Sequence, residues 1–291
     1  MRVLVITGDK SFGPGHPRYE LQRAAVDELV VLYWGRSAPV PRIPAGTFDV
    51  ITAQDPFWRG HLAGHIAWLK GARLNIQVHT DLSAYSRLKY WWAGFNLAHA
   101  DSIRVVSEKI KKQVEHMGVG AKITVLPVFV AVDLFKKITR RPDSGLVLWI
   151  GRFEDEKDPL YALEIIRHVP GARLVMLGAG SLEAVLRKRA QGLPVEFAGW
   201  QSPVQCLARA AVVLSTSRHE SFGVSIIEAL AAGVPVVASD VGIAREAGAI
   251  VVPKEQLAAE VQKVLQSGAA GRLQLQLPNA HEWAEMWKES L

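Results

Sequence analysis

Short apolar runs rich in Val, Ile and Leu recur along the chain, about 20–30 residues apart. Each run is continuous and does not alternate with polar residues, which is typical of parallel strands covered by helices on both faces. Amphipathic segments of helical length lie between most of the runs. The alternation predicts βαβ units and open parallel sheets, with about six strands in each half of the chain. The predicted strands are Val3–Thr7, Leu29–Tyr33, Asp49–Ala53, Asn75–His79, Ile103–Ser107, Ile123–Pro127, Leu146–Gly151, Arg173–Gly178, Val195–Gly199, Val212–Thr216, Val234–Ser239 and Ala249–Pro253.

A break near the middle of the chain divides these strands between two domains. Residues 136–145 are basic and then rich in turn-forming residues, and they predict a linker. We therefore expect an N-terminal α/β domain over residues 1–135 and a C-terminal one over residues 146–278. Residues 279–291 predict a short helix with one apolar stripe, which must be buried against another part of the chain. The stripe consists of Trp283, Met286, Trp287 and Leu291.

The composition is that of a folded protein. Of 291 residues, 49% are hydrophobic and 21% are charged, which excludes a disordered chain. A single cysteine, Cys206, excludes a disulfide within the chain and a zinc site built from cysteines. No apolar run approaches the ~18 residues of a membrane-spanning helix, so we expect a cytoplasmic protein.

Charge is distributed unevenly between the two halves. The net charge is +6, with 19 Lys or Arg against 11 Asp or Glu in residues 1–140 and 15 against 17 in residues 141–291. The basic N-terminal domain indicates an anionic acceptor or an anionic membrane surface as partner, and a solvated basic face is the alternative. The Tyr-Trp-Trp sequence at 90–92 is either an aromatic platform for that partner or part of the core. The basic residues of this prediction are Lys89, Lys109, Lys111 and Lys112.

Residues 215–239 combine a strand end, a loop, a helix and a glycine turn before the next strand. Glu220 and Glu228 are eight positions apart and would not share a face of one helix, which places Glu220 in the loop and Glu228 in the helix. The start of that helix offers free backbone amides and a helix dipole, which suit a diphosphate. Beside phosphates, the two carboxylates are better suited to accept hydrogen bonds from sugar or ribose hydroxyls. The residues at the helix start are Phe222, Gly223 and Val224.

Two cations lie in the loop that follows the strand 146–151. Arg152 and Lys157 are five positions apart, beyond the carboxyl end of that strand, where open α/β sheets bind their ligands. A guanidinium and an ammonium that converge there would neutralise a diphosphate leaving group. The alternative is that both are solvated loop charges.

These two stretches together resemble the retaining glycosyltransferases of family four, which adopt the GT-B fold. The pattern is Gly-Arg at 151–152 with Lys157, followed by Glu-Ser-Phe-Gly at 220–223 and Glu-Ala-Leu-Ala-Ala-Gly-Val-Pro at 228–235. Weaker matches follow in order through the N-terminal half. They cover residues 48–56, 78–79, 100–107 and 122–135. The resemblance implies two Rossmann-like parallel-sheet domains that face each other across a cleft.

The resemblance implies a role for each matching residue of the C-terminal domain. Arg152 and Lys157 would hold the donor phosphates. Glu220 would contact hydroxyls of the transferred sugar, and Glu228 would bond to the ribose. Catalysis would then rest on positioning and on stabilisation of leaving-group charge, without a protein nucleophile.

In the N-terminal domain the resemblance implies that His79 lies by the reacting face of the sugar. The family's first loop usually offers adjacent glycines, whereas this chain has Pro14 followed by Gly15, which leaves Gly15 as the donor-binding residue. The late Gly-Gly signature also differs, because Ile243 follows Gly242. Gly199 and Trp200, after another predicted strand, are candidates for a nucleobase pocket.

The sequence therefore predicts a retaining hexosyltransferase that uses a nucleotide-diphosphate sugar and a glycan, lipid or small-molecule acceptor. No metal or other cofactor is expected, because no Asp-x-Asp motif is present and His61 and His65, four positions apart, have no evident third ligand. We do not expect nucleic acid as a partner. We do expect peripheral contact with the inner face of a membrane. The alternatives are an epimerase or phosphorylase of nucleotide sugars on the same fold, or a non-catalytic glycosyltransferase-like subunit.

Overall fold

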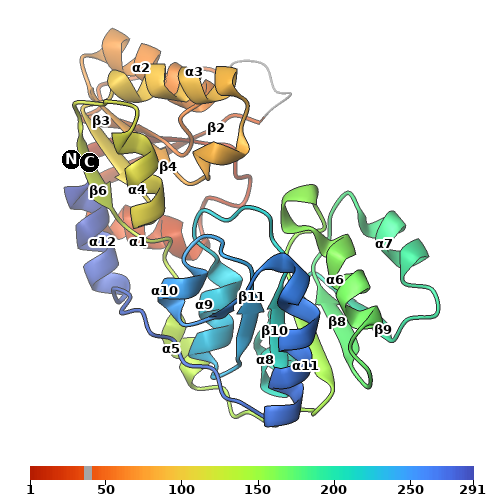
Figure 1. Ribbon diagram of the computed structural model, residues 1–291. Helices are drawn as coiled ribbons and strands as arrows, with labels where there is room; N and C mark the ends of the chain where they lie inside the picture. Colours follow the sequence, from red (N-terminus) through yellow and green to blue (C-terminus); the bar gives the residue numbers. More distant parts are fainter. Residues whose placement is uncertain (36–40) are drawn as a thin grey trace. The chain divides into compact units, whose positions relative to one another are not determined.

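The computed structural model describes residues 1–35 and 41–291. Contacts divide the chain into unit 1, Met1–Phe129 with Leu277–Leu291, and unit 2, Val130–Gln276. Each unit contains a six-stranded parallel sheet with helices packed against it (Figure 1). The prediction of two Rossmann-like α/β domains is confirmed.

The strands of unit 1 are arranged in the order β2-β1-β3-β4-β5-β6. The chain moves from β1 to β2 on one side and from β3 onward on the other, so the connections change direction between β1 and β3. Ligands of open α/β sheets bind at such a point. The strands are Arg2–Thr7 (β1), Glu28–Tyr33 (β2), Val50–Ala53 (β3), Arg73–Val78 (β4), Ser102–Val105 (β5) and Lys122–Val125 (β6). The helices are Pro17–Ala25 (α1), Trp58–Lys70 (α2), Leu82–Ala84 (η1), Arg87–Ala98 (α3), Glu108–Glu115 (α4) and Ala280–Glu289 (α12).

Helix α12 belongs to unit 1 although it ends the sequence. It begins with a capping box in which Asn279 and Glu282 satisfy each other's backbone amides. Trp283 and Trp287 are fully buried, and they form one core cluster with Val3, Val5 and Phe12. Helix α12 packs against α1 (Figure 1), and Trp283 Nε1 donates to the Pro127 carbonyl oxygen at 2.8 Å. The apolar stripe identified in the sequence is therefore buried within unit 1.

The strands of unit 2 follow the order β12-β11-β10-β7-β8-β9, so the connections change direction between β7 and β10. The strands are Leu146–Ile150 (β7), Arg173–Leu177 (β8), Val195–Gly199 (β9), Val212–Ser215 (β10), Val236–Ala238 (β11) and Ile250–Val251 (β12). The helices are Val132–Lys136 (α5), Asp155–Lys157 (η2), Pro159–Arg167 (α6), Glu183–Arg189 (α7), Val204–Arg209 (α8), Val224–Ala231 (α9), Ala244–Ala247 (α10), Lys254–Gln256 (η3) and Leu257–Ser267 (α11).

The domain boundaries differ from those expected at 135 and 279. Helix α5 packs against α9, and its Phe135 is buried, so unit 2 begins at Val130. The predicted linker 136–145 is fastened to unit 2, because Arg140 donates to the carbonyl oxygens of Ala210 (2.7 Å) and Gly233 (2.5 Å). Turn-forming residues and positive charge at 136–145 do not reveal these backbone acceptors, which lie about 70–90 positions away in the sequence.

Candidate functional site

The loops after β7 and β10 are fastened together at the point where the strand connections of unit 2 change direction. Arg218 N donates to the Glu156 carbonyl oxygen at 2.9 Å. The hydroxyl of Thr216 lies 2.9 Å from the carbonyl oxygens of Lys157 and Asp158, and it accepts a hydrogen bond from Trp149 Nε1 at 2.9 Å. The two loops therefore present their side chains at the same edge of the sheet.

Asp158 lies at this junction and has a backbone conformation that residues other than glycine rarely adopt. Its φ is +46°, and its buried carboxylate accepts from Arg218 Nε at 3.0 Å and from Lys254 Nζ at 2.8 Å. Burial alone would raise the pKa of Asp158, but the hydrogen bonds from Arg218 and Lys254 hold it below its ordinary value. Sequence reasoning missed all three residues, because Arg218 and Lys254 lie 60 and 96 positions from Asp158.

The same junction brings Lys157 and Glu220 into direct contact. Lys157 Nζ donates to Glu220 Oε1, and the Ser217 hydroxyl donates to the same oxygen at 3.0 Å. The two charged side chains are 18% and 11% exposed, so their attraction is screened less than that of a surface pair. The sequence pattern predicted both residues at one ligand site but did not predict that they would bind each other.

Helix α9 begins at Val224, four positions after Glu220. Gly223 has φ +105°, a conformation that a residue with a Cβ atom adopts only with strain. Gly242 has φ +53°, and a Cβ atom there would lie 2.5 Å from the Phe222 carbonyl oxygen and 2.9 Å from Glu220 Cβ. Gly242 thus permits the close packing that positions Glu220 and the start of α9. The sequence showed this glycine only as half of an incomplete Gly-Gly signature.

Glu228 lies in the second turn of α9 and is mostly buried. Burial raises the pKa of its carboxyl to about 7. Near neutral pH this side chain can therefore both donate and accept a hydrogen bond. Arg152 is exposed and pairs with Glu156 of its own loop at 2.6 Å. Trp200 follows the edge strand β9 and is 75% exposed, so its role at a nucleobase stays a prediction.

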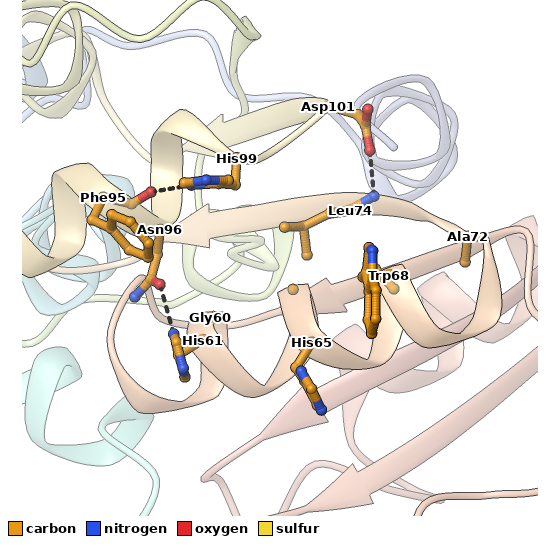
Figure 2. Close-up of a pocket in the computed structure, with 12 residues that line it drawn as sticks. Gly60, His61, His65, Trp68, Ala72, Leu74, Phe95, Asn96, His99 and Asp101 are labelled. Atoms are coloured by element: carbon orange, nitrogen blue, oxygen red, sulfur yellow. Dashed lines mark hydrogen bonds between the residues drawn. The ribbon is translucent and has the colours of Figure 1, made fainter.

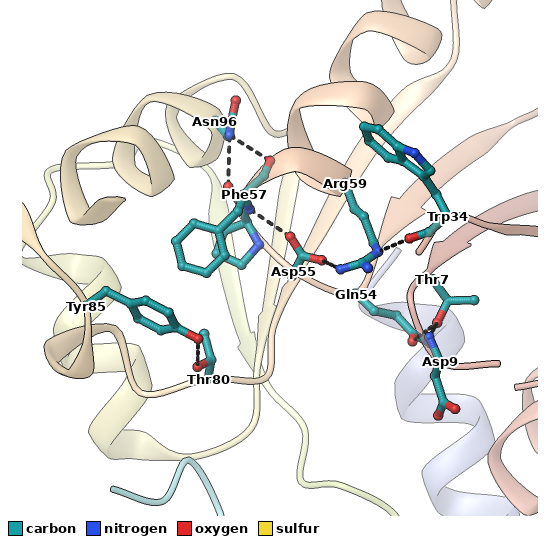
Figure 3. A network of polar contacts seen from close by, with 11 residues as sticks. Thr7, Asp9, Trp34, Gln54, Asp55, Phe57, Arg59, Thr80, Tyr85 and Asn96 are labelled. Atoms are coloured by element: carbon teal, nitrogen blue, oxygen red, sulfur yellow. Dashed lines mark hydrogen bonds and ion pairs between the residues drawn. The ribbon is translucent and has the colours of Figure 1, made fainter. Parts of the chain in front are cut away.

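Unit 1 contains a polar pocket of about 400 Å³ at the carboxyl ends of β1, β3 and β4. Figure 3 shows much of the hydrogen-bond network around it. Arg59 donates to Asp55 (2.6 Å) and to the Trp34 carbonyl oxygen (2.9 Å), and Gln54 accepts from Thr7 (2.6 Å). The pocket is lined by Gly8, Asp9, Arg18, Gln54, Asp55, Arg59, His79 and Thr80.

His79 is the predicted site residue that this pocket contains. Its Nε2 lies 3.0 Å from Gln77 Oε1. Burial, followed by the positive charges of Arg104 and Arg18, holds the pKa of His79 well below its ordinary value. The expected donor-binding amide of Gly15, in the loop after β1, donates to Glu20 Oε1 at 2.8 Å, so a phosphate bound there would have to displace that carboxylate.

A second cavity of about 400 Å³ lies between α2 and α3 and is lined by His61, His65 and His99 (Figure 2). The three rings have different partners: Asn96 Oδ1 for His61, the ring of Trp68 for His65 and the Phe95 carbonyl oxygen for His99. Within residues 1–35 and 41–291, no group of three or more His, Cys, Asp or Glu side chains could hold a metal ion.

The outer surface of α2 and α3 is aromatic. Trp58, Trp68 and Trp91 are 63%, 78% and 69% exposed, and Trp92 packs edge-on against Trp58. The tryptophan pair at 91–92 is therefore not simply part of the core. In the expected basic cluster, Lys109 pairs with Asp81 at 3.0 Å, and Lys111 pairs with Glu108 and Glu115 at 3.9 Å. None of the helices in the described part of the chain is long and apolar enough to cross a membrane.

Comparison with known families finds a match within the second unit. Residues 144–267 match the family model described as "Glycosyl transferases group 1". The chain is 32% identical over 231 residues to a glycogen synthase of Mycobacterium tuberculosis, which covers 72% of this chain and 53% of the relative. It is 30% identical over 159 residues to a GDP-mannose-dependent phosphatidylinositol dimannoside mannosyltransferase of the same species, which covers 49% and 42%. The chain spans about half the length of the curated relatives that it matches.

A solved structure supports the fold over the whole chain. HepE of Anabaena, solved with UDP and glucose, has a TM-score of 0.74 at 15% identity and covers all of this chain and 95% of its own. At this identity the likeness concerns the fold alone. Together with the two parallel sheets, it confirms the predicted GT-B architecture of two Rossmann-like domains.

Proposed function

We propose that this protein is a retaining glycosyltransferase that moves a hexose from a nucleotide-diphosphate sugar to a glycan, lipid or small-molecule acceptor. The observation that carries the proposal is the Lys157–Glu220 contact beside the start of α9. It joins a cation suited to a diphosphate with a carboxylate suited to sugar hydroxyls, at the edge of the sheet where open α/β folds bind ligands. The family match of residues 144–267 covers both loops.

The diphosphate is proposed to bind between the amides of residues 222–224 and the side chains of Arg152 and Lys157. The first backbone amides of a helix have no partner within it, and the helix dipole favours an anion there. Arg152 is exposed and pairs with Glu156 at the surface, so its side chain is able to turn toward a phosphate. Lys157 would then bridge the diphosphate and Glu220.

The transfer breaks the bond between the anomeric carbon and the phosphate oxygen and forms a bond from that carbon to the acceptor oxygen. The acceptor proton passes to the leaving phosphate, so no protein nucleophile takes part. Glu220 orients the sugar through its hydroxyls, Glu228 accepts a hydrogen bond from the ribose, and the cations stabilise the charge that develops on the leaving group. We expect the reaction to need neither a metal nor another cofactor.

The acceptor is proposed to bind in the polar pocket of unit 1, at the carboxyl ends of β1, β3 and β4. The guanidinium groups of Arg18 and Arg59, the carboxylates of Asp9 and Asp55 and the ring of His79 line this pocket. Donors and acceptors of hydrogen bonds in this number suit a polyhydroxylated molecule. The glycogen synthase and the phosphatidylinositol dimannoside mannosyltransferase that resemble this chain support the proposal of a glycan or a lipid acceptor.

An anionic membrane surface is proposed as a peripheral partner of α2 and α3. These helices expose tryptophans, carry Arg87 and Lys89, and contain neither Asp nor Glu. Tryptophan favours the interface of a bilayer, and each basic residue near an anionic surface contributes about 1 kcal/mol. Of the basic residues expected at this contact, Lys109 and Lys111 are paired with carboxylates. The proposal therefore rests on Lys89 and the exposed tryptophans.

Sedimentation with liposomes tests this contact. The protein should pellet with anionic phosphatidylglycerol vesicles at low salt, but not with neutral phosphatidylcholine vesicles or at high salt. Replacing Trp68 and Trp91 with Ser should abolish pelleting, whereas the exposed Trp200→Ser of unit 2 serves as the matched control. If the double variant pellets as well as the wild type, α2 and α3 are not the membrane contact. If the wild type does not pellet, there is no membrane contact and the acceptor is a soluble molecule.

A panel of nucleotide sugars tests the activity itself. Incubation with UDP-, GDP- and ADP-hexoses should release free nucleoside diphosphate from one of them, and faster when the acceptor is present. Proton NMR of the product should show the anomeric configuration of the donor. Inversion would refute the retaining mechanism, and an altered nucleotide sugar without transfer would indicate an epimerase.

A further inference from the structure

Four buried polar side chains form a row across the neighbouring strands β3, β4 and β5 of unit 1. Thr52, Asn75 and Gln77 are completely buried, and Arg104 is 1% exposed. A buried polar group costs free energy unless it is hydrogen-bonded. The donors and acceptors of this row must therefore match, which fixes the direction of each hydrogen bond.

Helix α12 sets the donor-to-acceptor direction of the hydrogen bonds at one end of the row. The Ser290 carbonyl oxygen, at the C-terminal cap of this helix, can only accept, so the Asn75 amide nitrogen donates to it at 2.8 Å. Asn75 Oδ1 consequently faces Thr52 Oγ1 at 2.7 Å. Because Oδ1 can only accept, the single hydroxyl hydrogen of Thr52 is used in this bond.

The direction continues through Gln77. Its amide nitrogen donates to the Thr52 oxygen at 2.9 Å, so its Oε1 faces the other way. There Oε1 lies 3.0 Å from Arg104 Nη1 and 3.0 Å from His79 Nε2. A guanidinium has no acceptor, so Arg104 requires the same orientation of the Gln77 amide. Since Oε1 cannot donate, His79 Nε2 must carry a hydrogen.

Arg104 is itself held firmly. Its guanidinium donates to the carbonyl oxygens of Leu126 and Pro127 at 3.2–3.4 Å and lies 5.1 Å from the ring centre of Trp283. Burial, followed by the charge of Arg18, lowers the pKa of Arg104 to about 9, so it is charged at neutral pH. The charges of Arg104 and Arg18 disfavour a positive charge on the His79 ring. The carboxylates that line the same pocket are each paired with an arginine, Asp9 with Arg18 and Asp55 with Arg59.

We propose that Gln77, oriented by Arg104 and by the hydrogen-bonded row that ends at Ser290, is a positioning residue that holds His79 with its hydrogen on Nε2 and a lone pair on Nδ1. His79 then serves as a hydrogen-bond acceptor for a substrate hydroxyl at the unit 1 pocket, and not as an acid. This role deepens the proposed function and rests on it. The tautomer itself rests only on the contacts of unit 1.

Nitrogen NMR of the full-length protein labelled at its histidines measures the tautomer directly. At pH 7 and without substrate, long-range proton–nitrogen correlation should show His79 neutral, with a protonated Nε2 and an unprotonated Nδ1. The His79→Gln variant assigns the signals. A hydrogen on Nδ1, or a charged ring at pH 7, would overturn the proposal. A protein with the expected tautomer that transfers no sugar would refute only the proposed function.

Two substitutions of Gln77 test whether this residue holds His79 in the Nε2–H tautomer. Gln77→Glu keeps an acceptor for both partners but adds a negative charge, so the Nε2–H tautomer should persist and the titration midpoint of His79 should shift upward. Gln77→Met removes the acceptor, and signals of both tautomers should appear. His61, whose ring faces Asn96 in the other cavity, is the internal control and should not change. An unshifted midpoint in Gln77→Glu, or a pure Nε2–H tautomer in a folded Gln77→Met, would contradict the assignment.

Discussion

Lys157 and Glu220 lie 63 positions apart in the sequence and form an ion pair at the junction of two loops. Before a donor binds, Glu220 neutralises the cation that is proposed to hold the diphosphate. In the proposed function a bound diphosphate would share Lys157 with Glu220, whose Oε2 would accept hydrogen bonds from sugar hydroxyls. Under this proposal, the ion pair would link binding of the diphosphate to binding of the sugar.

Arg152 and Lys157 are predicted to carry much of the affinity for the diphosphate. Arg152→Ala and Lys157→Met should each weaken binding of the preferred nucleoside diphosphate by about 10- to 150-fold, since a charge-assisted hydrogen bond contributes about 1.5–3 kcal/mol. Isothermal titration calorimetry measures this loss. Lys263→Ala, on the exposed face of α11, is the matched control and should bind like the wild type. Unchanged affinity in both site variants would exclude the assignment.

Glu228 is predicted to make unit 2 less stable as pH rises. Its pKa is about 7 in the folded chain, against about 4.5 when solvated, so the folded state holds a proton that the unfolded state releases between these values. Stability should fall over that window by about 3 kcal/mol and then level off. Glu228→Gln should stabilise the protein by about this amount at pH 8 and have little effect at pH 4.5.

Urea unfolding at the two pH values checks this prediction. Glu246→Gln, at an exposed position of α10, is the matched control and should change little at either pH. Equal effects of Glu228→Gln at pH 4.5 and pH 8 would show that its carboxyl titrates normally.

Among the elements, α12 shows how a segment distant in sequence completes a domain. Its tryptophans fill the core of unit 1, and its Ser290 cap is bonded to Asn75 within the sheet. The amphipathic spacing of Trp283, Met286, Trp287 and Leu291 was sufficient to predict this helix and its buried stripe. The bond from Asn75 was not predictable, because it joins residues 215 positions apart through a backbone oxygen.

Removal of one α12 side chain should destabilise unit 1. Trp287→Ala is expected to lower the free energy of unfolding by about 3–5 kcal/mol, because it empties a fully buried site. Trp200→Ala, at an exposed position, should cost less than about 0.5 kcal/mol. Hydrogen exchange should show faster exchange of β1 and β3 in Trp287→Ala. Wild-type protection of both strands would mean that α12 does not support the core.

At the scale of the whole molecule, the fold was predictable because parallel strands buried on both faces appear as continuous apolar runs. Arg152, Lys157 and Glu220 lie in loops after strands of one sheet and Glu228 lies in the following helix, as expected, while their roles stay predictions. The domain boundary at Val130 was not predictable from the sequence, because it depends on α5 packing against α9. The Asp158 contacts and the row from Ser290 to His79 also escaped prediction, because each joins residues far apart through individual bonds whose direction only the structure reveals.

Turnover of Glu220→Gln with the preferred nucleotide sugar tests whether the Lys157–Glu220 pair belongs to the donor site. The substitution keeps the size of the side chain but removes its negative charge and therefore its ion pair with Lys157. Sugar transfer should fall by at least about 100-fold, the loss expected when a group that orients the reacting sugar is displaced, while calorimetry still detects binding of the nucleoside diphosphate. Wild-type turnover in Glu220→Gln would contradict the assignment of this site.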